Sequence, residues 1–137
     1  MPDPQVDAPS VRDQGTRPDR TLVIKSGAGL EDPERCVQAF TVAATAVAMG
    51  VTVSLWLMGD AVQVAVPGAA DALDLPASAS LSDLLSTVLA DGALTVCTQC
   101  AARRGLGPED FIAGVRIAGA ASYVEEVLAP QAQALIY

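Results

Sequence analysis

Two cysteines, Cys97 and Cys100, are the residues whose type and spacing point most directly to chemistry. They lie in the segment 96–105, VCTQCAARRG. We expect Cys97 at the end of a buried strand, where the unpaired amides of the next helix would favour its thiolate form. Arg103 and Arg104, one turn after Cys100, would add positive potential. The segment therefore predicts a nucleophilic thiol, with Cys97 as the reactive member.

Other interpretations of this pair stay open. A CxxC motif can form half of a zinc site, but a structural site needs four ligands and the sequence has no second pair. A dithiol redox site at a helix start fits loosely. The two cysteines could also be inert, since buried thiols behave as small apolar residues. We predict neither a metal nor a cofactor.

The elements that must position the cysteines follow from the apolar pattern. Apolar β-branched runs bounded by turn residues predict strands, and apolar positions at helical spacing predict helices. Asp32 and Ser80 are the expected helix caps. The predicted strands are 21–24, 51–57, 94–97, 115–117 and 134–137, and the predicted helices are 33–49, 81–90, about 100–105 and 120–128. A helical turn is expected after Asp60 and a loop over 67–80.

Short apolar strands that alternate with helices predict an α/β fold, a three-layer α/β/α arrangement with a mainly parallel five-stranded sheet. The loops after the first three strands should meet at the carboxyl edge of this sheet. Gly27 and Asp60, in the first two loops, are therefore expected to support the cysteines. The segment 26–29, SGAG, is interpreted as a tight turn because it lacks a phosphate-loop pattern. Asp60 could orient a substrate or partner, or cap a helix.

Composition limits the domain organisation. The first 20 residues are rich in proline and charge and predict a flexible tail. Residues 21–137 predict a single domain. The sequence contains neither an apolar run long enough to span a membrane nor a recognisable signal peptide, so we expect a cytoplasmic protein with reduced thiols.

Charge and histidine content exclude several function classes. The net charge of −8 disfavours direct binding to nucleic acid and to anionic membranes. The chain has no histidine, which excludes a Ser-His or Cys-His catalytic pair within it.

A few further residues receive an interpretation. Cys36 is expected to fill the core, with the alternative that it borders the pocket of Cys97. Trp56 is expected in the core or at an interface. Arg116, unusual in a short strand, suggests an interface or active-site role. Glu125 and Glu126 are interpreted as solvated or capping charges.

The chain resembles the DsrE/DsrF family of small α/β proteins, which includes sulfur-relay subunits that thiolate tRNA. The residues that carry the resemblance are Cys97 with the small-residue helix and Arg-Gly that follow it, the Gly-turn and long helix over 26–50, and a final strand ending in an aromatic residue. It covers about residues 21–137. The resemblance implies that Cys97 accepts a persulfide sulfur and passes it on. Cys100 lies outside the family pattern and marks a CxxC-bearing subgroup. Trimers or hexamers are implied.

The sequence thus predicts a cytosolic sulfur-handling protein, a sulfurtransferase if it is active. Cys97 carries the persulfide, Cys100 assists or resolves it, and Arg103 and Arg104 stabilise the thiolate. The expected partners are further copies of the chain and a sulfur donor or acceptor protein. One alternative is a thiol redox sensor that forms a Cys97–Cys100 disulfide. The other is a non-enzymatic binding or assembly module with inert cysteines.

Overall fold

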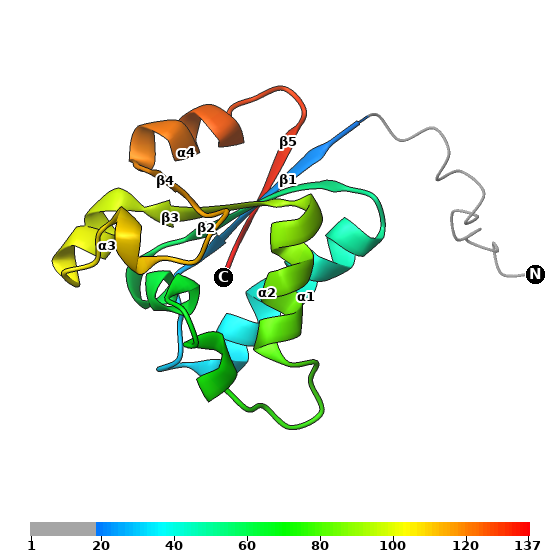
Figure 1. The fold of residues 1–137 in the computed structure, drawn as a ribbon. Helices are drawn as coiled ribbons and strands as arrows, with labels where there is room; N and C mark the ends of the chain where they lie inside the picture. Colours follow the sequence, from blue (N-terminus) through cyan, green and yellow to red (C-terminus); the bar gives the residue numbers. More distant parts are fainter. Residues whose placement is uncertain (1–18) are drawn as a thin grey trace, which may run out of the picture.

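A computed structural model describes residues 19–137, so most of the predicted tail, residues 1–18, lies outside the described residues. Five strands form one sheet in the order β4-β3-β2-β1-β5, and every neighbouring pair is parallel (Figure 1). The strands are β1 (Thr21–Ser26), β2 (Thr52–Leu57), β3 (Ala93–Cys97), β4 (Arg116–Ala118) and β5 (Ala132–Ile136). The predicted fold class is confirmed.

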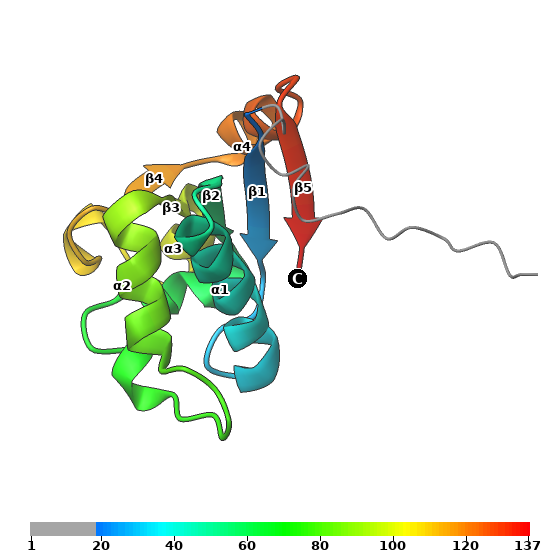
Figure 2. The same cartoon turned by 90° about the vertical axis from the view of Figure 1, so that its right-hand side faces the viewer.

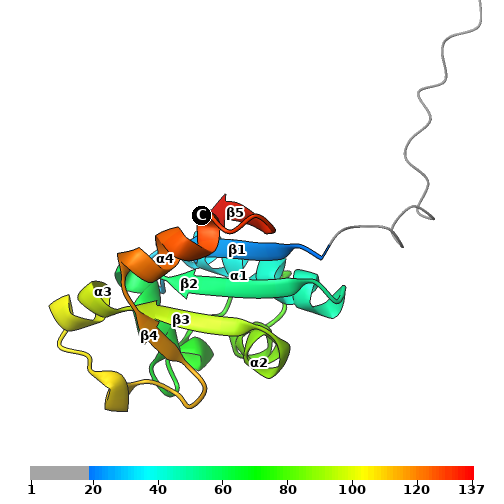
Figure 3. The ribbon, with the colours of Figure 1, turned by 90° about the horizontal axis from the view of Figure 1, so that it is seen from above.

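Helices lie on both sides of this sheet. The α-helices are α1 (Pro33–Ala48), α2 (Leu81–Asp91), α3 (Thr98–Arg103) and α4 (Ala120–Val127), and the 3₁₀ helices are η2 (Gly59–Ala65), η3 (Ala70–Ala72) and η4 (Pro108–Asp110). Seen along the edge in Figure 2, α1 and α2 pack side by side against one face. Figure 3 shows α4 crossing the opposite face. The three layers follow from strands that are apolar on both faces.

The apolar core lies between the sheet and the α1–α2 layer. Alternate residues of the central strands, such as Leu55 and Leu57, point toward Phe40 of α1, and all three are fully buried. Both predicted caps are confirmed. The Asp32 side chain accepts a hydrogen bond at the start of α1, and the Ser80 hydroxyl does so at the start of α2.

The start of helix α3, beside the cysteine pair, differs from the predicted start. Helix α3 begins at Thr98, two residues earlier than predicted, and Cys97 is its N-cap. The Cys97 side chain makes no capping hydrogen bond. Ser, Thr, Asp and Asn are the usual cap residues, so a cysteine at this position did not mark the start of a helix in the sequence. Smaller shifts occur in β4 and β5, and η3 interrupts the predicted loop over 67–80. Among residues 19–137, no helix is long and apolar enough to cross a bilayer.

The second face of the sheet is held by polar contacts. Helix α4 buries none of its residues. Its Glu126 carboxylate accepts hydrogen bonds from Ser54 Oγ (2.6 Å) and Trp56 Nε1 (2.9 Å) and forms an ion pair with Arg116. The interpretation of Glu126 as a solvated or capping charge is wrong, because its side chain is only 24% exposed.

Aromatic contacts complete this cluster. The Arg116 guanidinium lies 5.3 Å from the centre of the Trp56 ring, a cation–π distance. Tyr123 of α4 meets the same ring edge-on, at 5.4 Å between centroids. Arg116 Nε also donates to Thr95 Oγ1 at 2.9 Å. Trp56 is thus fully buried, as the core interpretation expects, and its indole N–H is paired.

These contacts set the ionisation of Glu126. Partial burial acts to raise its pKa, but the hydrogen bonds from Ser54, Trp56 and Arg116 and the positive charge of Arg116 outweigh it, so the pKa is lowered. A carboxyl group with a lowered folded-state pKa stabilises the fold above its unfolded value, about pH 4.3. That contribution is lost as the pH falls through the lower, folded-state pKa.

The first prediction concerns Glu126→Gln. The variant should lose about 1–3 kcal/mol of unfolding free energy at neutral pH, because it leaves Arg116 and the indole with a weaker acceptor. The deficit should shrink below about pH 4. Urea unfolding followed by the fluorescence of Trp56, the only tryptophan of the chain, measures it. The exposed neighbour Glu125→Gln is the control. Equal losses in both variants would contradict the assignment.

Candidate functional site

The cysteine pair lies where β3 passes into α3. Cys97 is the last residue of β3, and Cys100 follows in the first turn of α3. Both thiols are free and almost fully buried, with 6% and 9% of each residue exposed. Their predicted place at a strand end is confirmed.

The loops after β1 and β2 meet beside this pair. Gly59 has a positive φ of 54°, and a Cβ built on it would lie 3.1 Å from the Gly27 carbonyl oxygen. A Cβ on Gly29 would overlap the backbone of Asp60. Both positions therefore require glycine. The predicted convergence of the loops at the carboxyl edge of the sheet is confirmed.

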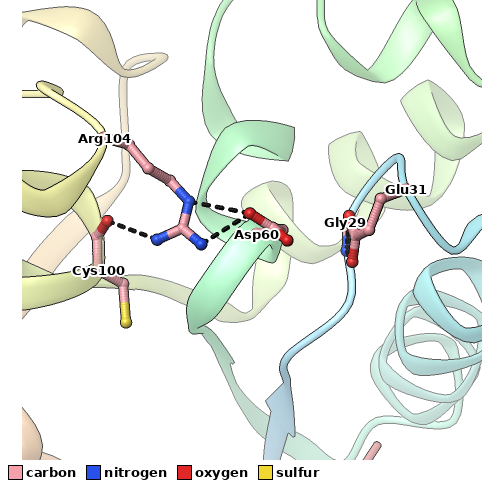
Figure 4. Close-up of polar contacts among 5 residues, drawn as sticks. All are labelled: Gly29, Glu31, Asp60, Cys100 and Arg104. Atoms are coloured by element: carbon pink, nitrogen blue, oxygen red, sulfur yellow. Dashed lines mark hydrogen bonds and ion pairs between the residues drawn. The ribbon is translucent and has the colours of Figure 1, made fainter.

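An ion pair joins the second loop to α3. Arg104 donates from Nε (3.1 Å) and Nη2 (2.7 Å) to one carboxylate oxygen of Asp60, and from Nη1 to the Cys100 carbonyl oxygen (3.0 Å). Figure 4 shows this guanidinium between the two residues, with the Cys100 sulfur directed away from it. Arg104 thus holds α3 against η2. The helix-cap alternative for Asp60 is wrong, because η2 has no side-chain cap hydrogen bond.

The first loop is closed by its own carboxylate. The Gly29 N–H donates to both oxygens of Glu31 at 2.9 Å, as Figure 4 shows. The Ser26 hydroxyl donates to the Ala28 carbonyl oxygen at 3.3 Å. A carboxylate on this amide repels a phosphate, so the geometry favours the tight-turn interpretation over anion binding.

The surroundings of Cys100 lower the pKa of its thiol. Burial acts to raise this pKa. The backbone N–H of Gly59, the Cys97 side chain, and the charges of Arg103 and Arg104 act in the opposite direction and prevail. Cys100 has only an assisting or resolving role in the prediction from the sequence, but its neighbours favour the thiolate form of its side chain.

Gln99 is a second neighbour of the pair. Cys97 Sγ lies 3.5 Å from Gln99 Oε1, a distance at which the thiol donates weakly. The Gln99 amide also lies over Gly119, at the start of α4. The Cys97 thiol thus donates to Gln99, and its side chain is also among the groups that lower the pKa of Cys100. Gln99 was not predicted from the sequence, since an exposed glutamine inside CxxC carries no distinctive pattern. Gly59 was not predicted either, although a glycine two residues after a strand could have marked it.

Cys36 does not belong to this site. It is fully buried in the core on α1, as the core-filling interpretation predicts. Burial, and then the negative charges of Glu31 and Asp32, raise the pKa of Cys36 to about 12. Arg116 is not a member of the cysteine site either. Its side chain contacts Thr95, Trp56 and Glu126. Within residues 19–137, no cluster of three or more His, Cys, Asp or Glu side chains could hold a metal ion.

Comparison with known sequences identifies relatives of the chain. The sequence model of the DsrE/DsrF-like family matches residues 21–134. The uncharacterized protein MJ0760 of Methanocaldococcus jannaschii is 28% identical over 116 residues, which cover 84% of this chain and 42% of that relative. The chain therefore spans less than half the length of this curated relative.

Solved structures share the fold. The ychN protein of E. coli superposes with a TM-score of 0.71 at 19% identity, over 87% of this chain and 99% of that chain. Protein MTH1491 of Methanobacterium thermoautotrophicum superposes with a TM-score of 0.65 at 12% identity, over 87% and 100% of the two chains. At these identities the likeness establishes the three-layer fold.

The second prediction concerns the ionisation of Cys100. In a Cys97→Ser variant, which keeps a hydrogen-bond donor, iodoacetamide should alkylate Cys100 with a pH midpoint below about 8.5, the free-thiol value. Cys97→Ala, which removes the donor, should raise the midpoint. Peptide mass mapping across the pH range measures both, and Cys36 should stay unmodified. Equal midpoints at or above the free-thiol value would refute the assignment.

The third prediction separates the two arginines. Arg104→Ala should cost about 1 kcal/mol of unfolding free energy, because it breaks the bonds to Asp60 and to the Cys100 carbonyl. Arg103→Ala, at an exposed position, should leave stability within about 0.5 kcal/mol of the parent but raise the alkylation midpoint of Cys100. Urea unfolding and alkylation rates measure the two effects. Identical behaviour of both variants would show that Arg104 is not a structural tie.

Proposed function

Because the chain belongs to the DsrE/DsrF-like family, we propose that it handles sulfane sulfur and carries a persulfide on Cys97. The observation that supports this most is the placement of Cys97 at the end of β3, hydrogen-bonded to a thiol whose neighbours favour its thiolate. The family match supports a sulfur-relay type of protein. The roles of the individual cysteines are our proposal.

Loading of Cys97 needs a base, and the chain has no histidine to supply one. We assign this role to Cys100. Its thiolate takes the Cys97 proton along the hydrogen bond between the two side chains, and the Cys97 thiolate attacks the outer sulfur of a donor persulfide. The donor S–S bond breaks as the new one forms. The donor leaves as a thiolate and receives the proton from Cys100, so that one persulfide replaces another and no external oxidant is consumed.

The surroundings of the pair suit this exchange. The Gly59 N–H and Arg103 stabilise the Cys100 thiolate before and after the step. Asp60 and Arg104 position α3, and the charge of Arg104 adds to that of Arg103 in lowering the pKa of Cys100. When Cys100 is protonated, Gln99 Oε1 can accept the hydrogen bond that the Cys97 thiol donates. Gly27 supports the site through the close contact of its carbonyl with Gly59.

We also propose that the chain works in the cytoplasm as a homo-oligomer, a trimer or hexamer, and exchanges sulfur with a donor or acceptor protein. Three large apolar residues are available for contacts between copies. They are Val124 on α4, Leu128 at the C-cap of α4 and Ile136 on β5, which are 48%, 76% and 69% exposed. The net charge of −8 supports a protein partner over direct contact with nucleic acid or an anionic membrane.

A second candidate is a thiol redox sensor. The same adjacent thiols favour it, because a peroxide could oxidise the Cys100 thiolate to a sulfenic acid that Cys97 then condenses with to form a disulfide. This candidate needs an oxidant and leaves no extra sulfur on the chain, so mass distinguishes it from sulfur carriage.

The fourth prediction tests the carrier. Incubation of the reduced Cys100→Ser chain, which cannot form the Cys97–Cys100 disulfide, with a cysteine desulfurase and cysteine should add about 32 Da, one sulfur atom, to Cys97. In this background the adduct should be absent after Cys97→Ser and present after Cys36→Ser, the matched control in the core. The unsubstituted chain is treated in parallel. Mass spectrometry after blocking of free thiols measures it. A Cys97–Cys100 disulfide with no adduct on any variant would favour the sensor, and no modification at all would support the binding module.

A further inference from the structure

We propose that the pair also releases the sulfur that it carries. Cys100 attacks the Cys97 persulfide, the sulfane sulfur leaves as sulfide, and a Cys97–Cys100 disulfide forms. This inference rests on the proposed function, since it begins from a persulfide on Cys97. It adds a second, reductive outcome to the same site. A sulfur atom that meets no acceptor thiol leaves as sulfide.

The geometry places the attacking sulfur in position. Cys97 is the N-cap of α3 and Cys100 is the third residue of that helix, so both side chains lie on the same face of one helical turn. A hydrogen bond between the two side chains is among the causes that lower the pKa of Cys100. A persulfide on Cys97 keeps its inner sulfur, the Sγ atom, on this same helical turn.

The surroundings also favour the internal attack over attack from solution. The inner sulfur of a Cys97 persulfide belongs to the residue that caps α3. Cys100 stands beside it and acts at the high effective concentration of a group in the same molecule. The thiolate is the attacking form in such exchange, and the neighbours of Cys100 favour that form. Cys36 is a poor competitor, because it is fully buried and its pKa is raised to about 12.

The step balances without an external oxidant. The Cys100 thiolate forms a bond to Cys97 Sγ, and the bond between Sγ and the outer sulfur breaks. The outer sulfur leaves as hydrosulfide and keeps the persulfide proton. It is reduced by two electrons, and the two cysteine sulfurs are oxidised to a disulfide. An external thiol or dithiol must reduce this disulfide before the next round.

The test uses the reduced full chain without free reductant, under anaerobic conditions, with one equivalent of glutathione persulfide as the probe. Sulfide is trapped with monobromobimane and quantified, and the protein mass is recorded after thiol blocking. The wild-type chain should release close to one sulfide per chain above the background of a Cys97→Ser, Cys100→Ser double variant, and should gain a Cys97–Cys100 disulfide. Cys100→Ser should keep the adduct of about 32 Da on Cys97 and release no sulfide above background. Cys36→Ser should behave as the wild type.

The outcomes separate this inference from the function on which it rests. If the wild type keeps the adduct on Cys97 and releases no sulfide above background, the discharge step is overturned and the carrier stands. If neither wild type nor Cys100→Ser gains an adduct, and no sulfide appears above background, both are overturned. A disulfide that forms equally with glutathione disulfide in place of the persulfide, without sulfide release, would also overturn the discharge step and would favour the redox sensor.

Discussion

The close contact between the loops after β1 and β2 is the constraint on which the cysteine site depends. The carboxyl ends of parallel strands lie at one edge of the sheet. Only glycine allows the loops at this edge to pack backbone against backbone. The Gly59 amide reaches Cys100 because Gly59 adopts a positive φ against the Gly27 carbonyl. The Asp60–Arg104 pair then fixes α3 to this contact. The lowered pKa of the Cys100 thiol therefore depends on backbone geometry as well as on the charges of Arg103 and Arg104.

The two faces of the sheet are stabilised by different forces. The face toward α1 and α2 buries an apolar core, which favours folding through the hydrophobic effect. The face toward α4 is tied by the carboxylate of Glu126, the Arg116 guanidinium and the Trp56 ring. Polar ties of this kind are screened by salt and change with pH as the carboxylate titrates. The cysteine pair is anchored to the first, apolar layer.

Much of the fold could be predicted from the sequence because it rests on local patterns. Buried parallel strands give apolar runs, and Asp32 and Ser80 mark helix starts with capping side chains. The start of α3 was predicted two residues too late, because a cysteine occupies the cap position and makes no capping hydrogen bond. Three further features could not be predicted for another reason: the Asp60–Arg104 pair, the contacts of Glu126 and the lowered pKa of Cys100. Each joins residues that are distant in the chain, and only the packed fold brings them together.

In the proposed function, a chain without histidine carries sulfane sulfur on Cys97. Cyanolysis tests sulfur carriage, because cyanide removes the outer sulfur of a persulfide as thiocyanate and restores the thiol. After loading to completion by a persulfide donor, with solvent as the base in place of Cys100, and removal of the donor, the Cys100→Ser chain should yield close to one thiocyanate per chain. The Cys97→Ser chain should yield none. Thiocyanate from Cys97→Ser in the same amount, or none from either variant, would contradict the account.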